Sequence, residues 1–220
     1  NIILEDTASY ADIHADDVVL EIGPGLGVLT QYLVKDAKKV ISIELDHSLI
    51  PIVKKELSDH RNLRIVEGNI LDIPNQELLN MLYDRKDAYG SYKVVANIPY
   101  SITSPILRKF TEQGPAPDLM VFLVQKEVAQ RVTAQPGALS ILGIALQFYC
   151  DVEYMTTVPA SDFFPPPEVD SAVIRCTRNE KYIIELEEKN ITIKEFFRII
   201  KIGFSAKRKK LYNNIASGLH

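Results

Sequence analysis

The sequence has little of what several classes of protein require. Its only two cysteines, Cys150 and Cys176, lie far apart and outside any C-x-x-C motif, so neither a disulfide framework nor a zinc site is expected. The four histidines have no ligand spacing, and we expect no metal. No apolar run approaches the ~18 residues of a membrane helix, and Asn1–Asp12 mixes charges into its apolar positions, unlike a signal peptide. We therefore expect a cytoplasmic protein with no membrane contact.

The net charge of the whole chain is also small, but the charges are distributed unevenly along it. The net charge of -4 argues weakly against binding to nucleic acid. From Lys194 to the end, however, there are seven Lys or Arg residues and a single acid, Glu195. A polyanion would therefore have to bind to a local basic patch such as this one. With 46% hydrophobic and 25% charged residues in 220, the composition is globular and excludes a disordered, collagen-like or coiled-coil chain.

Strand-like and helix-like segments alternate through the first two thirds of the chain. The expected strands cover residues 17–22, 39–45, 63–67, 92–96 and 119–124, and the expected helices cover 26–34, 46–58, 77–83, 104–110 and 125–131. Asp46 is a plausible N-cap of the second helix. Apolar strands that alternate with helices predict an α/β fold with a doubly wound, Rossmann-like parallel sheet and a ligand at the carboxyl ends of the strands.

The pattern changes after about Gly137. Residues 151–158 and 171–177 are predicted to be antiparallel strands around the proline-rich bend at 165–167, and 193–204 to be an amphipathic helix that runs into the basic residues 207–210. We expect a catalytic domain over 1–178 and the start of a small helical domain over 179–220. Both ends of the chain are expected to be trimmed.

A glycine-rich loop follows the first strand. Gly23, Gly25 and Gly27 give the spacing G-x-G-x-G, which is neither the dinucleotide fingerprint nor a Walker loop. About 20 residues on, Glu44 ends the second strand, where a carboxylate can accept both hydroxyls of a ribose. Without a phosphate site, S-adenosylmethionine fits better than NAD. The structural alternative is a tight turn and a solvated glutamate.

The segment Asn97-Ile-Pro-Tyr100 follows the fourth strand. Adenine's amino group is a poor nucleophile, and the Asn97 side-chain carbonyl together with a backbone carbonyl near Ile98–Pro99 can accept its two hydrogens. Tyr100 can stack on an extruded base. The alternative is an ordinary turn at a strand end, which becomes a poor explanation once the glycine loop and Glu44 precede it in this order.

These motifs resemble the small-subunit ribosomal RNA adenine N6-dimethyltransferases over nearly the whole chain. The similar segments are 20–30, 97–105, 125–131, 163–175 and 197–214. The macrolide-resistance methyltransferases of the large subunit share Asn-Ile-Pro-Tyr but are less similar at 103–105 and 169–171. DNA adenine methyltransferases usually carry a different motif, Asp/Asn-Pro-Pro-Tyr/Phe/Trp.

The resemblance implies a role for each matching residue. Gly23 and Gly25 would line the cofactor, with Gly23 at its methionine part, and Glu44 would hold the ribose. Asn97 would hold the target amine beside the cofactor, and Tyr100 would stack on the target adenine. Phe163 would be a second aromatic residue near the target base. Asn69, which replaces the family's usual Asp, would contact the adenine of the cofactor, and Asp72 is the other candidate for this role.

The resemblance also implies a partner. It predicts dimethylation of two adjacent adenines in small-subunit rRNA, within immature small ribosomal subunits, by a monomer. The basic residues Lys207, Arg208, Lys209 and Lys210 would contact RNA phosphates, although a charge run is more often a solvated helix end. Two other functions stay open: a non-catalytic assembly factor on the same fold, and a large-subunit rRNA methyltransferase.

Overall fold

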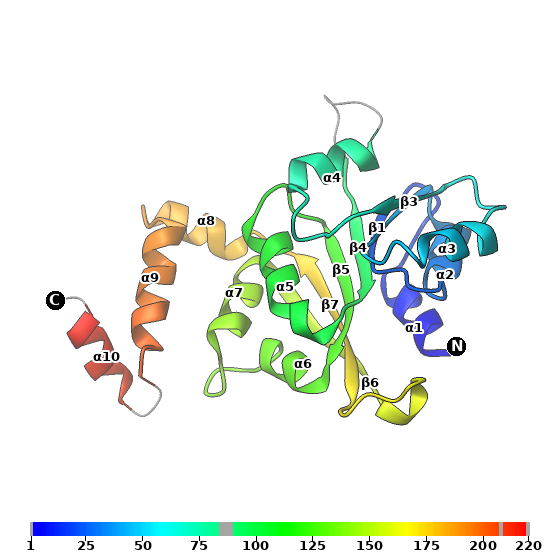
Figure 1. Ribbon diagram of the computed structural model, residues 1–220. Coiled ribbons are helices and arrows are strands. Elements are labelled where there is room, and N and C mark those ends of the chain that lie inside the picture. The colour runs from blue at the N-terminus through cyan, green and yellow to red at the C-terminus, as the bar shows by residue number, and fades with distance from the viewer. Residues whose placement is uncertain (1, 84–89, 207–208, 219–220) are drawn as a thin grey trace.

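The computed structural model describes residues 2–83, 90–206 and 209–218, and a single seven-stranded sheet lies at its centre (Figure 1). The strand order is β3-β2-β1-β4-β5-β7-β6. The strands are β1 (Val18–Ile22), β2 (Lys39–Glu44), β3 (Leu63–Glu67), β4 (Lys93–Asn97), β5 (Leu119–Gln125), β6 (Cys150–Val158) and β7 (Ser171–Arg178). The first five strands pair in parallel, and β7 runs antiparallel between β5 and β6. The predicted doubly wound sheet with an antiparallel edge is confirmed.

The winding of the sheet reverses direction at β1, which pairs with β2 on one side and β4 on the other. Ligands of open α/β sheets bind outside the carboxyl ends of the strands at such a switch point. The glycine loop after Ile22 and the Asn97 segment both begin at this edge. The topology therefore brings the two predicted motifs together.

Helices cover both faces of the sheet, which explains why β1 and β5 are almost continuously apolar and buried. The core on one face includes side chains of α4 to α7, and the core on the other includes side chains of α2. The helices of the sheet domain are α1 (Ile2–Tyr10), α2 (Thr30–Asp36), α3 (Ile50–Glu56), α4 (Asn75–Leu82), α5 (Thr103–Glu112), α6 (Lys126–Val132) and α7 (Ile141–Tyr149), with short 3-10 turns at Tyr100–Ile102 and Ala160–Asp162.

Two helices begin later than the sequence predicts, in each case because of turn chemistry. The chain between Gly23 and Leu29 forms turns, so α2 starts at Thr30 rather than at Leu26. The Asp46 carboxylate accepts hydrogen bonds from the Ser48 backbone N–H (2.9 Å) and hydroxyl (2.6 Å), and α3 starts only at Ile50. The prediction that Asp46 is the N-cap of this helix was therefore wrong.

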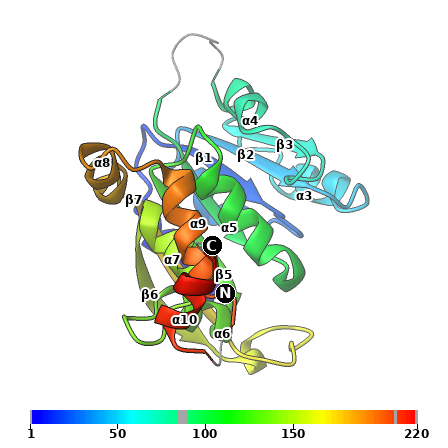
Figure 2. The ribbon, with the colours of Figure 1, turned by 90° about the vertical axis from the view of Figure 1, so that its left-hand side faces the viewer.

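Three further helices, α8 (Lys181–Glu188), α9 (Ile193–Gly203) and α10 (Leu211–Gly218), follow the last strand and lie on the outer side of α7 (Figure 2). An aromatic cluster joins them to the sheet domain: Phe148 of α7 stacks on Phe196 of α9, with ring centroids 5.0 Å apart. The Thr192 hydroxyl and the Glu195 carboxylate form a capping box at the start of α9. The division into two domains at residue 178 stays a prediction.

The sequence predicted that the helix at 193–204 would run directly into the basic segment, but α9 ends before it. The helix ends at Gly203, and the exposed residues Lys209 and Lys210 precede α10. Lys207 and Arg208 lie outside the described residues. The Asn214 amide donates to the carbonyls of Gly203 (2.7 Å) and Ala206 (3.1 Å), which fastens α10 to the end of α9. None of the described helices is long and apolar enough to cross a membrane.

Candidate active site

The glycine loop turns sharply away from the carboxyl end of β1. Gly23, Gly25 and Gly27 have φ values of +66°, +57° and +81°, a region that side chains other than glycine rarely adopt. At Gly27 an added Cβ would also be crowded, because it would lie 3.1 Å from Val53 Cγ1. Conformation and close packing together explain the spacing G-x-G-x-G without any phosphate ligand.

Glu44 fastens this loop to the end of β2. Its Oε2 accepts the Gly25 N–H at 3.0 Å and its Oε1 accepts the Asp46 N–H at 2.9 Å, and the residue is only 7% exposed. An ionised carboxylate has about four acceptor sites. Two acceptor sites therefore remain for a ligand, as a ribose with two neighbouring hydroxyls would need. Glu44 is both a loop anchor and a candidate ribose ligand, whereas the sequence suggested only the second role.

A buried carboxyl group below the loop was not assigned a role from sequence. Glu21 in β1 is fully buried, and it accepts hydrogen bonds from the hydroxyls of Thr30 in α2 (2.8 Å) and Ser42 in β2 (2.5 Å). Burial raises the pKa of Glu21 to about 7, although the Ser42 and Thr30 hydrogen bonds oppose the shift. An acid inside a strand buried on both faces is the sequence signal that marks it.

The two candidates for the cofactor adenine are joined to each other after β3. The Asn69 amide nitrogen donates to the Asp72 carboxylate at 2.9 Å, and its oxygen accepts the Leu71 N–H at 3.1 Å. Asn69 therefore orients Asp72 while its own oxygen is partly engaged. Asp72 is exposed, so its carboxylate oxygens can serve as the acceptor that the sequence assigned to either residue.

Asn97 stands at the end of β4 with its side chain exposed. No side chain in the described part of the chain bonds its amide, so both polar atoms are available to a substrate. The next residue, Ile98, is 1% exposed and donates its N–H to the Leu123 carbonyl at 3.2 Å, which fixes the backbone. The Pro99 carbonyl accepts from Ile102 (3.1 Å), so the Ile98 carbonyl is the freer of the two predicted backbone acceptors.

A cavity of about 290 Å³ opens beside Asn97 and brings together three residues assigned from sequence. Tyr100 and Phe163 both line it, together with Ile98, Pro99, Pro165 and Pro167. Two aromatic rings and one free amide around a small space suit a flat heteroaromatic ring that carries an amino group. This cavity thus has the chemistry expected of a pocket for an extruded adenine.

The start of β7 holds both sides of this cavity. The Ser171 hydroxyl lies 2.6 Å from the Tyr100 hydroxyl, and Ser171 is fully buried. The neighbouring Asp170 accepts the Ala160 N–H at 3.1 Å, at the base of the loop that carries Phe163, and the Lys126 ammonium at 3.2 Å. The Ala160 hydrogen bond and Lys126 lower the pKa of Asp170. Asp170 and Ser171 belong to a segment that carried the resemblance, but sequence gave them no role.

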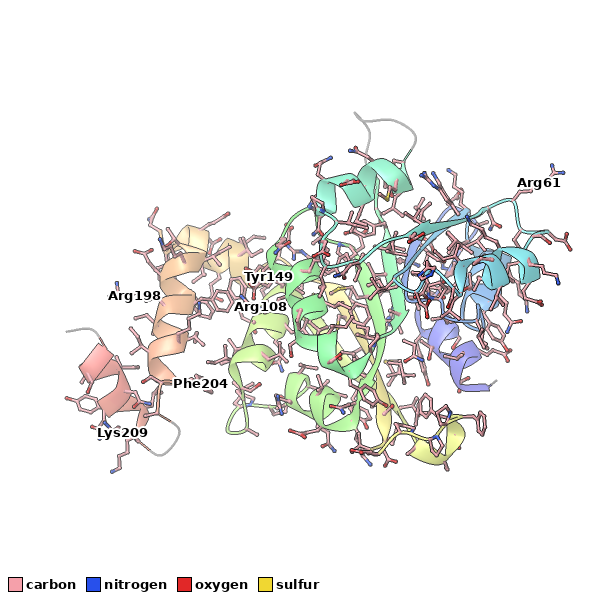
Figure 3. All side chains as sticks on the ribbon, in the orientation of Figure 1. Arg61, Arg108, Tyr149, Arg198, Phe204 and Lys209 are labelled. Atoms are coloured by element: carbon pink, nitrogen blue, oxygen red, sulfur yellow. The ribbon has the colours of Figure 1, made fainter. Side chains whose placement is uncertain are left out.

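Of the predicted RNA-binding residues, the two that the structure describes, Lys209 and Lys210, do not line this cavity. Lys209 lies beyond α9, at the opposite end of the molecule from Arg61 in the turn between α3 and β3 (Figure 3). Both lysines of the segment that the structure describes, Lys209 and Lys210, are exposed. That Lys209 and Lys210 contact RNA phosphates therefore stays a prediction.

Comparison with known proteins identifies the family. The model of the ribosomal RNA adenine dimethylase family matches residues 2–220. A curated relative from Alkaliphilus metalliredigens, named ribosomal RNA small subunit methyltransferase A, is 39% identical over 219 residues, which cover 99% of this chain and 74% of the relative. A relative of the same name from Dehalococcoides mccartyi is 39% identical over 217 residues, 99% of this chain and 71% of the relative.

Solved structures agree with the family model. A dimethyladenosine transferase from Plasmodium falciparum superposes with a TM-score of 0.79 at 32% identity, covering 96% of this chain and 72% of that one. The 23S rRNA methyltransferase ErmE also gives a TM-score of 0.79, at 25% identity, covering 99% of this chain and 82% of that one. With this fold, this edge-of-sheet site and these relatives, the chain belongs to the ribosomal RNA adenine dimethylase family.

Proposed function

We propose that this protein is an S-adenosylmethionine-dependent methyltransferase that dimethylates the N6 amine of adenines in small-subunit rRNA. The observation that carries the proposal is the position of the free Asn97 amide. It lies beside a cavity with two aromatic rings, at the same edge of the sheet as the glycine loop and Glu44. The family and the names of its curated relatives support the reaction and the substrate.

The residues of the chain bind and orient rather than supply a base. S-adenosylmethionine, when bound, supplies the methyl group. Glu44, Gly23, Gly25 and the Asn69–Asp72 pair hold it on one side of the switch point. On the other side, the Asn97 oxygen and the Ile98 carbonyl accept the two amino hydrogens of the adenine. Because these acceptors withdraw the nitrogen lone pair from the ring, the amine becomes a better nucleophile, and catalysis is mostly positioning and electrostatics.

The two aromatic residues hold the adenine that has left its strand. Tyr100, whose hydroxyl is fixed by Ser171, and Phe163 line the cavity that would receive the base. The proton is lost from the positively charged product after transfer, so no general base is required before attack. A cavity lined by Asn97, two aromatic residues and apolar residues agrees with this mechanism, since the mechanism requires no base.

Methyl transfer from radiolabelled cofactor tests this function. The protein is incubated with small ribosomal subunits that lack the modification, and in parallel with naked large-subunit RNA. We expect label in N6-dimethyladenine of the small-subunit RNA alone. Label in the large-subunit RNA would instead assign the protein to the other rRNA substrate, and binding without transfer would indicate an assembly factor.

A further inference from the structure

Phe164 stands in the chain between two residues that line the proposed base cavity, Phe163 and Pro165, and has no part in the proposed function. Phe164 follows Phe163, whose ring lines the cavity and packs against the core, yet Phe164 is 101% exposed. No large hydrophobic side chain in the described part of the chain is more exposed. A single exposed apolar residue is ordinary on a protein surface. What distinguishes Phe164 is its place beside the cavity-lining Phe163 and the fixed backbone of its loop.

The loop that carries Phe164 is fixed on both sides. Three prolines, 165 to 167, follow it directly, and each proline holds its φ near one value. Before it, the Ala160 N–H is bonded to Asp170, and the Phe163 N–H donates to the Ala160 carbonyl at 3.3 Å. The backbone thus presents the ring of Phe164 outward while Phe163 faces the cavity. Little backbone freedom therefore remains to be lost when a ligand meets the ring.

The position next to the cavity decides the class of ligand. If an adenine leaves an unpaired RNA strand and enters the cavity, the nucleotide beside it stays covalently attached and loses a stacking neighbour. Its base then has a free π-face close to the rim. Base–aromatic stacking is strong and tolerates any base identity, which suits an uncharged phenyl ring without a hydrogen-bonding group.

We propose that Phe164 stacks on the nucleotide adjacent to the target adenine, so that one loop provides an inner ring for the target base and an outer ring for its neighbour. This inference rests on the proposed function. It assigns Phe164 to RNA affinity and to positioning of the strand, while the reacting amine is held by other residues. Stacking of one base is worth ~1–3 kcal/mol, so Phe164→Ala should weaken RNA binding about 5- to 150-fold.

A fluorescent adenine analogue tests the contact directly. 2-Aminopurine is placed in a small-subunit rRNA fragment either at the target position or at the nucleotide on its 5′ or 3′ side, and its quenching by the protein is measured. With wild-type protein we expect quenching at the target and at one neighbour. Phe164→Ala should abolish quenching at the neighbour and keep it at the target, and Phe164→Trp should restore it.

Controls separate stacking from general loss of apolar surface. Phe164→Leu keeps bulk but not the aromatic face, so it should behave nearly as Phe164→Ala. Ile184→Ala, at an exposed residue of α8, should leave RNA binding unchanged. Unchanged RNA affinity and unchanged quenching in Phe164→Ala would overturn the proposal. It would equally be overturned if the variant lost binding only to assembled subunits and not to naked RNA, which would point to a protein partner.

The outcome can be told apart from failure of the proposed function. If wild-type protein transfers no methyl group to small-subunit RNA, the function fails whatever Phe164 does. If wild-type protein is active and the Phe164→Ala variant shows unchanged RNA affinity and an unchanged methylation rate at subsaturating RNA, the function stands and the stacking contact falls.

Discussion

At the scale of single residues, Glu44 both anchors the glycine loop and is proposed to bind the ribose, so its removal should strongly weaken cofactor binding. Glu44→Ala removes two proposed hydrogen bonds to the ribose and also releases the Gly25 N–H of the loop. Hydrogen bonds to charged groups contribute about 1.5–3 kcal/mol each, so cofactor affinity should fall by at least 100-fold. Titration calorimetry with S-adenosylmethionine measures this. Glu56→Ala, at an exposed carboxylate of α3, is the control and should bind as wild type. Unchanged affinity in Glu44→Ala would place the ribose elsewhere.

Glu21 predicts a pH dependence of stability. Its pKa is 4.5 in the reference state and about 7 in the fold. Below pH 4.5 both states hold the proton; between pH 4.5 and 7 only the folded state holds it, so stability falls as pH rises, by up to about 3 kcal/mol, and is level above pH 7. In Glu21→Gln the side chain is neutral throughout and can still bond Thr30 and Ser42.

Urea unfolding of the cofactor-free protein between pH 4 and 8 measures the effect of Glu21. The difference in unfolding free energy, Glu21→Gln minus wild type, cancels the other titrating groups. It should rise between pH 4.5 and 7 and then stay constant. A difference that does not vary with pH would mean that the pKa of Glu21 is the same in the folded and unfolded states.

At the scale of elements, the parallel strands were predicted almost residue for residue. β3 begins and ends where the sequence indicates. β1 and β5 are nearly as well predicted, since a strand buried by helices on both sides shows as an apolar run between polar turns. Helix starts were less predictable. Left-handed glycines delay α2, and the Asp46 side chain closes a local turn before α3, and neither effect alters the apolar periodicity from which helices are predicted.

The candidate site was likewise predictable only in part from the sequence. Asn97, Tyr100 and Phe163 could be chosen from motifs, and the structure does place them around one cavity. The hydrogen bond between Tyr100 and Ser171 spans 71 positions in the chain, and no spacing rule predicts it. The same holds for Glu21, whose partners come from α2 and β2. Pairings of this kind depend on the register of strands that are distant in sequence.

The segment between α9 and α10 predicts a salt effect. Replacing Lys207, Arg208, Lys209 and Lys210 with Ala should weaken RNA binding and flatten its salt dependence, with a loss in slope of roughly 0.7–0.9 for each phosphate contact removed. Cofactor binding should not change. RNA binding measured at several salt concentrations gives the slope, with Lys54 and Lys55 on α3 replaced as the control. If these residues only keep the surface solvated, the slope will equal that of wild type.

At the scale of the whole molecule, the proposed sites for the cofactor and for the target base lie on either side of one switch point. β1 leads to the glycine loop, the proposed cofactor site, and β4 leads to Asn97 and the proposed base cavity. Asp170 and Ser171, at the start of β7, bond the loop that carries Phe163 and the Tyr100 hydroxyl. The C-terminal helices are joined to this sheet through the aromatic cluster around Phe148 and lie on the outer side of α7. The proposed chemistry and the predicted RNA contacts of Lys209 and Lys210 therefore involve different elements of the chain.

The most direct test of the central claim is the methylation state of small-subunit adenines, mapped by mass spectrometry after reaction with wild-type protein and with Asn97→Ala. Asn97 is proposed to act on the target amine more strongly in the transition state than in the ground state. Loss of such a preorganised partner costs ~10²–10³ in rate. We predict dimethylated adenines with wild-type protein, and at least a hundredfold slower transfer by the variant with nearly unchanged cofactor affinity. Near-wild-type turnover by Asn97→Ala would contradict the account.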